Sequence, residues 1–393
     1  MMHRRRLVVP FLVASLALVT SCDAEPTYDD ALPGRPEAGQ WMDVLPGGDT
    51  MCARGGEYRF ITRGGDPNKV IIDFQGGGAC WNSTTCGFAA ALFSDETFTA
   101  EQFEGAIAGG TLGGLFDPDG EFGDWTIVHV PYCTGDIHWG NASVDYGDGV
   151  TIEHRGYVNA QAALDWVYTR YPEAGQILVS GCSAGAYGAA LHSAYIQQQY
   201  PEAQVSVLAD SGAGIITDDF LEESLPNWNA EGALPPFIPG LQRPLAELSL
   251  TDLYIQIGQH FPEMRLAQTG TQFDQDQIFF FTAMGGDSAD WPGLYRDSLS
   301  RIDDELDNFT AYVPPGSVHC VTIYDFFETR EVNGVGLAEW TSDLVEADSI
   351  PPTVACEGAG CCDDPICDAC GDSTEGHCQF CLQWPPPWSE CAE

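Results

Sequence analysis

A serine in a glycine-flanked turn is the residue of this sequence best suited to covalent chemistry. Ser183 stands at the centre of Gly181-Cys182-Ser183-Ala184-Gly185, between an aliphatic run at 176–180 and a helix-forming stretch at 186–199. In a strand–turn–helix of this kind, a strained turn lifts the serine hydroxyl above the sheet, and the following N–H can stabilise an oxyanion. The pattern therefore predicts Ser183 as a nucleophile and the Ala184 N–H as an oxyanion donor, rather than a chance glycine-rich turn.

A second glycine cluster could complete that oxyanion site. Gly76, Gly77 and Gly78 follow an apolar run at 70–74 and precede Ala79. Glycines at a strand end let backbone N–H groups approach a ligand closely, and serine hydrolases use such a loop for a second donor. We expect the N–H groups of Gly77 and Gly78 to serve here. A phosphate-binding loop is the alternative, but the Lys-Ser/Thr pair that would support it is missing after these glycines.

A serine nucleophile also needs a general base, which is usually a histidine. His192 falls on the helix that carries the nucleophile, where it is poorly placed to return to Ser183, and His377 belongs to the C-terminal tail. His319 follows a strand candidate at 311–313 and a Pro-Pro-Gly turn, which is where a catalytic loop belongs. The sequence therefore predicts His319 as the base, in preference to a structural surface histidine.

The base in turn needs a carboxylate to orient it, and the sequence alone leaves several choices. Asp274 follows a strand candidate at 266–269 and opens an apolar helix-like stretch, with Asp276 two residues later. Asp210 ends another strand and is the rival, and any of these residues could instead cap a helix. Because Ser-His-Asp chemistry runs on protein groups alone, no metal or organic cofactor is predicted.

Strands and helices alternate around these residues, which predicts an α/β fold with a mostly parallel sheet covered by helices. The expected strands are 70–74, 126–130, 176–180, 204–209, 266–269 and 311–313. The expected helices are 157–170, 186–199 and 294–309.

The charge balance excludes one large class of partner. The 393 residues hold 58 Asp and Glu against 15 Lys and Arg, and Lys69 is the single lysine, for a formal net charge of −43. Nucleic-acid binding depends on cationic contacts with phosphate, so it is ruled out, and anionic membrane surfaces are disfavoured. With 44% hydrophobic residues the chain is nonetheless globular.

The N-terminus predicts export. Three arginines precede a short apolar run that is too short to span a bilayer, so residues 1–22 are expected to be a signal peptide. Val19-Thr20-Ser21-Cys22 is typical of a bacterial lipobox, which would make Cys22 a lipid anchor, and ordinary cleavage nearby is the alternative. Setting Cys22 aside leaves 14 of the 15 cysteines, an even number that suits disulfides outside the cytosol.

The remaining sequence divides into three parts. Residues 23–40 are polar and proline-containing and are expected to be a linker, residues 41–350 form the hydrolase domain, and residues 351–393 form a Cys-rich tail. The tail contains Cys367-Asp368-Ala369-Cys370 and Cys378-Gln379-Phe380-Cys381. Such pairs can hold structural zinc, but eight cysteines in an exported tail favour a disulfide knot.

Taken together, the motifs resemble those of the pectin acetylesterase/Notum family, over about residues 41–330. They are Gly76-Gly77-Gly78-Ala79-Cys80-Trp81-Asn82, the Ser183 pentapeptide, Asp210-Ser211-Gly212, Phe273-Asp274-Gln275-Asp276-Gln277 and His319-Cys320. The resemblance implies an α/β-hydrolase-like fold, selects Asp274 as the triad acid, and makes Asp210 a wall residue of the site. The family usually carries an aromatic residue at or just before Ala79, and this departure is expected to reshape the acyl pocket.

The family pattern also suggests how the cysteines pair. It implies a Cys80–Cys86 loop, and a Cys182–Cys320 bridge would tie the nucleophile to the base, which turns Cys182 from a rival nucleophile into a staple. Cys52 and Cys133 are then left as a third pair.

Three functions remain open on the sequence. The resemblance implies an esterase that removes acyl groups, acetate above all, from a polysaccharide or a small ester, although pectin is itself polyanionic and so is this chain. A lipid or protein O-deacylase of the Notum type needs a deep apolar acyl pocket. A catalytically silent surface-binding protein is disfavoured, because every expected triad residue is present. The sequence does not indicate an oligomeric state.

Overall fold

The structure is a computed structural model that describes residues 32–87 and 92–363. The predicted signal peptide, the lipid-anchor residue Cys22 and the two Cys-x-x-Cys pairs of the tail lie outside the described residues.

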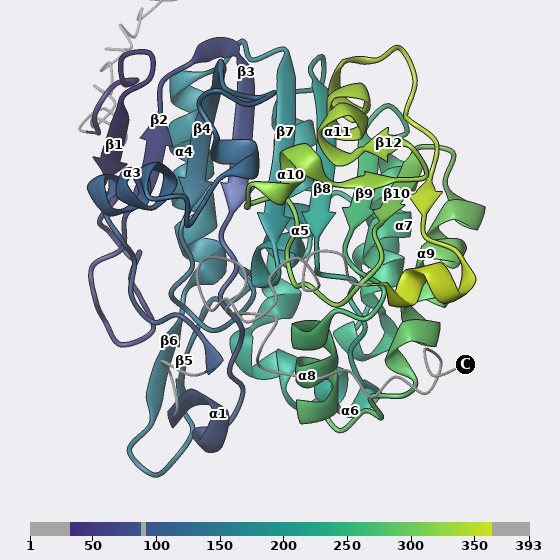
Figure 1. The fold of residues 1–393 in the computed structure, drawn as a ribbon. Helices are drawn as coiled ribbons and strands as arrows, with labels where there is room; N and C mark the ends of the chain where they lie inside the picture. The colour runs from purple at the N-terminus through teal and green to yellow at the C-terminus, as the bar shows by residue number, and fades with distance from the viewer. Residues whose placement is uncertain (1–31, 88–91, 364–393) are drawn as a thin grey trace, which may run out of the picture.

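A nine-stranded sheet forms the centre of the molecule (Figure 1). In spatial order its strands are β1 (Trp41–Val44), β2 (Phe60–Arg63), β4 (Trp125–Val130), β3 (Asp66–Phe74), β7 (Gln176–Cys182), β8 (Gln204–Asp210), β9 (Arg265–Thr269), β10 (Phe309–Val313) and β13 (Val354–Ala355). From β4 to β13 every neighbouring pair is parallel, whereas β1–β2 and β2–β4 are antiparallel. The predicted mostly parallel sheet is therefore confirmed.

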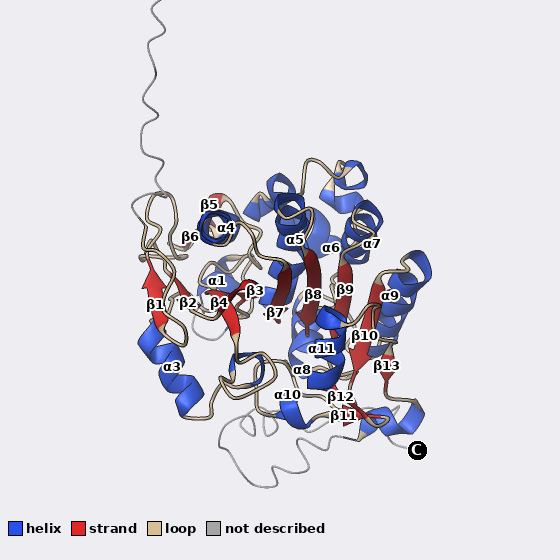
Figure 2. Cartoon of the chain, turned by 90° about the horizontal axis from the view of Figure 1, so that it is seen from above, coloured by secondary structure: helices blue, strands red, loops and turns tan. Residues whose placement is uncertain are grey.

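Helices cover both faces of this sheet, because both faces of its central strands are apolar. Val70 and Ile72 of β3 belong to one hydrophobic cluster and Ile71 between them to the other, as the alternation of side chains along a strand requires. Figure 2 shows the two helical layers. The first is built from α4 (Gly156–Arg170), α5 (Ala184–Gln199), α7 (Leu250–His260) and α9 (Trp291–Glu305), and the second from α3 (Ala100–Ala108), α10 (Phe326–Thr329) and α11 (Leu337–Glu346).

Smaller elements gather at the carboxyl ends of the parallel strands, at the bottom of Figure 1. They are α1 (Ser83–Gly87), α6 (Asp218–Glu223), α8 (Gln275–Ala283) and the hairpin of β5 (Ala142–Asp145) and β6 (Thr151–His154). A second hairpin joins β11 (Glu331–Val332) to β12 (Val335–Gly336). In open α/β sheets this is the edge at which ligands bind, so these elements surround the position expected for a site.

Both ends of the described chain contact the sheet domain. Trp166 Nε1 donates a hydrogen bond of 2.9 Å to the carbonyl of Pro33, within the expected linker. β13, beyond the expected boundary at Ile350, pairs with β10, and the amide of Cys356 donates to the carbonyl of Val313 at 2.9 Å. The division of the chain into domains remains a prediction. Among the described residues, no helix is both long and apolar enough to cross a bilayer.

Candidate active site

Ser183 occupies the sharp turn between β7 and α5. Its backbone has φ 57° and ψ −124°, a strained conformation for a residue with a side chain, and α5 begins at the next residue, Ala184. The turn brings strand and helix so close that a Cβ on Gly181 would collide with the backbone of Gly185. The Ala184 amide is at the first turn of α5, where N–H groups have no partner within the helix and can bind an anion.

The glycine loop after β3 lies directly against this turn. A Cβ built on Gly76 would stand 2.6 Å from the carbonyl oxygen of Cys182 and 3.0 Å from the Cβ of Ser183, so only glycine fits there. The loop is held to the following segment by hydrogen bonds from the Ala79 amide to Leu92 and from the Ser94 amide to the carbonyl of Gly77.

These loop contacts leave two amides available beside the nucleophile. Within the described chain, no backbone carbonyl accepts a hydrogen bond from the amides of Gly77 or Gly78. Together with the Ala184 amide, these are the groups predicted to form the oxyanion site, and that role remains a prediction.

His319 and Asp274, which are 45 residues apart in sequence, form a close pair. Nδ1 of His319 lies 2.8 and 2.9 Å from the two carboxylate oxygens of Asp274, which is fully buried. Asp274 also caps α8, because it accepts hydrogen bonds from the amide and the side-chain Nε2 of Gln277, each at 3.0 Å. Since Nδ1 faces the carboxylate, Nε2 is the ring atom left for proton transfer.

A second carboxylate lies on the other side of the imidazole ring. Oδ2 of Asp276 is 4.0 Å from Nε2 of His319, and the Asp276 side chain is half-exposed. Burial of the ring lowers the pKa of His319, but the carboxylates of Asp274 and Asp276 outweigh this effect and raise the pKa to about 9.

Asp210, the rival acid, holds the loop that carries the base. Its Oδ2 accepts hydrogen bonds from the amides of Val321 and Thr322 and from the Thr322 hydroxyl, at 2.7 to 2.8 Å. The Ser211 hydroxyl donates to Oδ1 of Asp210 and accepts from the Cys320 amide. Asp210 therefore fixes the backbone after His319, while the imidazole itself is paired with Asp274.

The three expected disulfides are confirmed. The structure joins Cys52 to Cys133, Cys80 to Cys86, and Cys182 to Cys320, and it adds Cys356–Cys361 at the start of the tail. The Cys182–Cys320 bridge connects residues adjacent to Ser183 and to His319 across 138 positions of sequence. Cys182 is consequently a staple, and its thiol is consumed.

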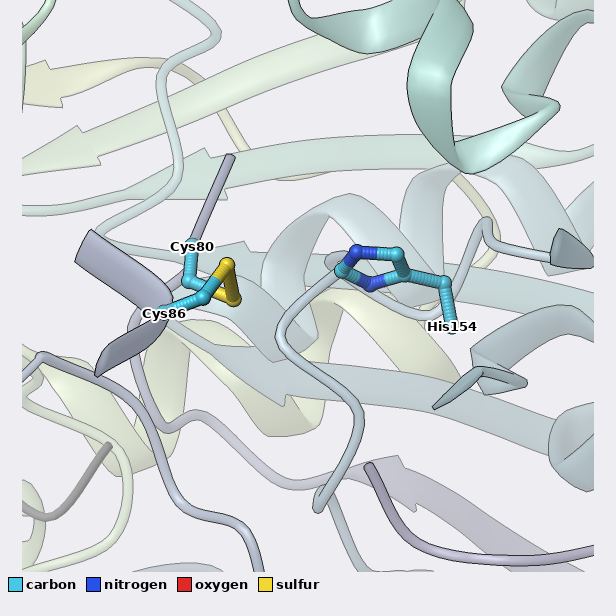
Figure 3. Close-up of side chains that lie close together, drawn as sticks. All are labelled: Cys80, Cys86 and His154. Carbon is cyan, nitrogen blue, oxygen red and sulfur yellow. A yellow bond between two sulfur atoms is a disulfide. The ribbon is translucent and has the colours of Figure 1, made fainter. Parts of the chain in front are cut away.

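One other group of side chains has the composition of a metal site. Cys80, Cys86 and His154 lie together, with the imidazole turned toward the sulfurs (Figure 3). The two sulfurs are bonded to each other, and both ring nitrogens of His154 are engaged, with the Thr134 carbonyl at 2.8 Å and the Tyr146 hydroxyl at 2.9 Å. The two cysteines therefore offer no thiolate, and the ring nitrogens of His154 are occupied by hydrogen bonds, so a metal lacks its usual ligands here.

Ser183 and His319 both border two cavities. The smaller one, of about 60 Å³, is apolar, and we call it the acyl cavity. Its walls include Ala79, Trp81, Ile137, Tyr187, Ile215, Ile216, Phe220, Leu225, Trp228, Leu250, Phe280 and Met284. The larger one, of about 790 Å³, is an open depression that we call the groove. It extends from Ser183 past Asp276 and the 92–98 segment to His129 and Tyr324.

The motif resemblance agrees with comparisons to known proteins. A family model described as Pectinacetylesterase matches residues 51–226. Pectin acetylesterase 5 of Arabidopsis thaliana is 27% identical over 172 residues, which are 42% of this chain and 39% of the relative. The palmitoleoyl-protein carboxylesterase NOTUM of Schmidtea mediterranea is 26% identical over 157 residues, 37% of this chain and 28% of that protein.

The fold agrees as well. The structure of the Wnt deacylase Notum from Drosophila superposes with a TM-score of 0.61 at 16% identity, and it covers 81% of this chain and 97% of that one. The chain is thus similar in sequence to the pectin acetylesterase/Notum family over residues 51–226, and it shares the fold of Notum. It matches less than two fifths of the length of the pectin acetylesterases it resembles, and the family model ends before Asp274 and His319.

The departure of Ala79 from the expected motif falls on the acyl cavity. Ala79 and Trp81 both line this cavity. Trp81 and Phe280 remain as aromatic walls, and Phe220 packs edge-on against Trp81 with ring centroids 5.2 Å apart. The cavity is therefore narrow even though this position holds a small residue.

Sequence reasoning missed two features of the site. The motif resemblance selects Asp274 over Asp276 as the acid, yet the carboxylate of Asp276 also lies 4.0 Å from Nε2 of His319. His129 was not singled out, because a histidine inside a strand, in Thr126-Ile127-Val128-His129-Val130, gives no signal of its own. Its partner Asp73 sits in the same position of β3, so the pair could be found only by aligning the two strands.

Proposed function

We propose that this protein is an exported serine carboxylesterase that removes short acyl groups, chiefly acetate, from a polysaccharide. The observation that carries the proposal is the pairing of His319 with the buried Asp274 beside a serine on a strained strand–helix turn. That combination belongs to nucleophilic acyl transfer. The family relationship supports ester hydrolysis rather than another acyl chemistry.

The mechanism follows from the atoms available. Nε2 of His319 takes the proton of the Ser183 hydroxyl, and the oxygen attacks the ester carbonyl. The amides of Ala184, Gly77 and Gly78 receive the negative charge that develops on the carbonyl oxygen. His319 returns the proton to the departing alcohol, then activates the water that releases the acid from the acyl-enzyme. Asp274 holds the ring orientation and stabilises the imidazolium in both steps.

The acyl cavity supports a short acyl group. Its volume is about 60 Å³, whereas a dry apolar cavity of about 150 Å³ holds a single benzene ring. A palmitoleoyl-sized chain has many more carbon atoms than benzene and does not fit into so small a space. The apolar lining is the one observation that favours the second candidate, a lipid or protein O-deacylase, and the volume weighs against it.

The export part of the proposal rests on the N-terminal sequence and on the cysteines. Four disulfides among the described residues suit an oxidising compartment outside the cytosol. Attachment through a lipidated Cys22 is proposed from the sequence alone, and mass analysis of the mature N-terminus tests it.

An acyl-length profile tests the enzymatic proposal. Hydrolysis of p-nitrophenyl esters from C2 to C10 is measured with the wild-type protein and with Ser183→Ala. We expect kcat/KM to be highest at C2 and to fall steeply beyond C4, with Ser183→Ala inactive on every ester. Inactivity of the wild type would leave the silent-binding alternative, and equal activity of the two proteins would contradict Ser183 as the nucleophile. An optimum at C8 or C10 would favour the lipid deacylase.

A further inference from the structure

Among the described residues, the lining of the groove next to Ser183 contains acidic side chains and two histidines, but no lysine or arginine. Among the described residues, the ionisable side chains other than histidine and tyrosine that line it are Asp73, Asp95, Glu96 and Asp276, and neither lysine nor arginine is present. Asp95 is partly balanced by Arg54 at 3.4 Å, across an exposed contact. Glu96 is exposed, and Asp276 faces His319, so both contribute negative potential where the alcohol half of an ester must lie.

That potential acts on any charged substrate. At physiological salt the screening length is about 8 Å, so a uronate held inside the groove would feel the carboxylates of Glu96 and Asp276 with little screening. Among the described residues, the protonated imidazole of His319 is the cation that faces Asp276, and the lining contains no lysine or arginine to balance Glu96. The charge of the whole chain, −43, adds repulsion during approach. The groove therefore disfavours a polyuronate, although it has room for several sugar rings.

Three polar side chains lie next to one another on adjacent strands, and two of them, His129 and Asp73, line the groove. His129 of β4, Asp73 of β3 and Ser180 of β7 are paired in register, so their side chains lie in a row on one face of the sheet. Nδ1 of His129 is 2.7 Å from Oδ2 of Asp73, and the Ser180 hydroxyl donates to Oδ1 of Asp73 at 2.7 Å. All three are almost fully buried.

The row ends in an unused nitrogen. Nε2 of His129 is buried and has no hydrogen-bond partner among residues 32–87 and 92–363, although the residue belongs to the groove lining. Leaving such an atom unpaired is costly, which points to a partner that arrives with a ligand. A hydroxyl group suits this atom in either protonation state of the ring, because it can both donate and accept.

Aromatic rings surround the same nitrogen. The rings of Phe98, Phe103 and Phe116 lie with their centroids 5.6, 4.7 and 5.6 Å from that of His129, and all three line the groove. Phe98 is half-buried, whereas Phe103 and Phe116 are almost fully covered. Apolar faces with one placed polar atom suit a ring that presents both C–H faces and hydroxyls.

We propose that the groove binds an uncharged carbohydrate, the alcohol half of the ester, and that Nε2 of His129 hydrogen-bonds one of its hydroxyls. This inference rests on the proposed esterase function for its catalytic meaning. Nε2 is covered in the unliganded protein, so binding moves a neighbouring side chain, and Phe98 is the half-buried ring beside it. The acidic lining makes a neutral glycan the substrate class and excludes a polyuronate.

Binding tests the substrate class independently of turnover. Calorimetric titration of the Ser183→Ala protein with a neutral β-linked hexasaccharide and with hexagalacturonate compares the two classes directly. We expect the neutral sugar to bind at least tenfold more tightly at low salt, with the difference narrowing as salt is added. Equal or tighter binding of hexagalacturonate overturns the inference, and so does the absence of binding by either sugar.

Turnover distinguishes a failure of this inference from a failure of the esterase proposal. Wild type and Glu96→Lys are compared on acetylated glucomannan, acetylated polygalacturonate and p-nitrophenyl acetate. We expect Glu96→Lys to raise kcat/KM on the polyuronate severalfold and to change kcat/KM on the uncharged p-nitrophenyl acetate by a much smaller factor. Inactivity on all three substrates contradicts the esterase proposal, whereas activity with a preference for the polyuronate contradicts this inference alone.

His129→Asn tests the role of the nitrogen. The Asn side-chain amide can still donate to Asp73 in place of Nδ1, but it removes Nε2. We expect about a fivefold rise in KM for the neutral glycan, as for the loss of one hydrogen bond, and a smaller effect on p-nitrophenyl acetate, whose alcohol half has no sugar hydroxyl to bind. A purely structural role would lower the melting temperature and affect both substrates equally. If this variant does not fold, Phe98→Ala, at a half-buried position, must weaken hexasaccharide binding instead, and unchanged binding refutes the assignment.

Discussion

The acyl cavity and the groove share Gly78, Ser183, Phe280 and His319, yet they differ in volume and in the polarity of their other walls. The cavity holds about 60 Å³ between apolar walls, and the groove holds about 790 Å³ and carries carboxylates. Under the proposed function, the first would select the acyl group by size, whereas the second would accept a large alcohol and select it by charge. The proposed nucleophile would then have two sources of specificity.

The two regions also come from different parts of the chain. The outer wall of the acyl cavity is formed by residues 215–228, which include α6, and by Met284 after α8. The groove is bounded by residues 92–116, by His129 of β4 and by the 320–324 loop. Substitutions in one region should therefore leave the selectivity of the other unchanged, and each prediction below tests whether that separation holds.

Loss of Asp274, the proposed triad acid, should stop the hydrolysis of small esters and of acetylated glycans alike. In Asp274→Asn we expect kcat to fall about 10⁴-fold on every ester, because the amide no longer holds His319 in its working orientation. Steady-state hydrolysis of p-nitrophenyl acetate and of an acetylated glycan measures this. Asp276→Asn is the matched control and should cost less than tenfold. Equal losses in the two variants would show that the acid has been assigned wrongly.

A methyl group at the junction of the two regions should be the next most harmful change. In Gly76→Ala the new Cβ meets the Cys182 carbonyl and the Ser183 Cβ. The loop must then shift, and misplacing its amides should lower kcat by about 10²–10³-fold, as the loss of one oxyanion donor does. Kinetics on short and long acyl esters should show the same factor for both. A loss confined to long esters would contradict a role in the oxyanion site.

The dependence of kcat/KM on pH should show the effect of Asp276, the carboxylate near Nε2 of His319. His319 acts as a base only when neutral, and its pKa is raised to about 9. At pH 7 about a hundredth of it is neutral, so kcat/KM should rise about fiftyfold up to pH 9 and level off above that pH, at about a hundred times the pH 7 value. Asp276→Asn removes one of the carboxylates responsible and should move this rise to lower pH. A plateau reached already at pH 7 in the wild type would contradict the raised pKa.

The same ionisation predicts how stability depends on pH. Because the folded protein binds the His319 proton more tightly than the unfolded chain does, this group stabilises the fold fully below its ordinary pKa of 6.5. That contribution is lost as the pH rises through about 9. Denaturant unfolding of wild type and His319→Gln at pH 6 and pH 10 measures it, and a difference that grows toward pH 10 would have the wrong sign.

Widening the acyl cavity should change the selectivity for acyl length and leave the selectivity for the charge of the alcohol unchanged. Met284→Ala removes a partly buried wall residue. Each extra methylene buried in the new space is worth about 0.8 kcal/mol, so burial of two methylenes should raise the C6-to-C2 ratio of kcat/KM about fifteenfold. Glu96→Gln, in the groove, should leave this ratio unchanged. An equal change in both variants would mean that the two regions are coupled.

The sequence predicted the central strands and the nucleophile turn because their signals are local. Aliphatic runs such as 176–180 are bounded by glycines and a proline, and the structure has strands and helices within a few residues of each predicted position. The pairing of His319 with Asp274 was reached only with the help of family motifs. Nothing in the sequence of residues 265–276 distinguishes Asp274 from Asp276. In the structure, Asp274 caps α8 and pairs with Nδ1 of His319.

What the sequence could not provide were contacts set by strand order. Asp73, His129 and Ser180 are neighbours only because β4, β3 and β7 are adjacent and in register. The size of the acyl cavity has a similar origin, because it depends on how residues 215–228 pack across Trp81 and Ala79. These contacts and this cavity volume are set by the tertiary structure, and no pattern of residue types along the sequence indicates them.

The last strand of the sheet carries a practical consequence. β13 covers the outer edge of β10, where it pairs with Tyr312 and Val313. A protein shortened to the expected boundary at Ile350 would expose that edge, and unpaired edge strands recruit strands from other molecules. Such a truncated protein should self-associate and precipitate even if its active site is complete, so expression trials of the isolated hydrolase should retain the chain at least through Cys361.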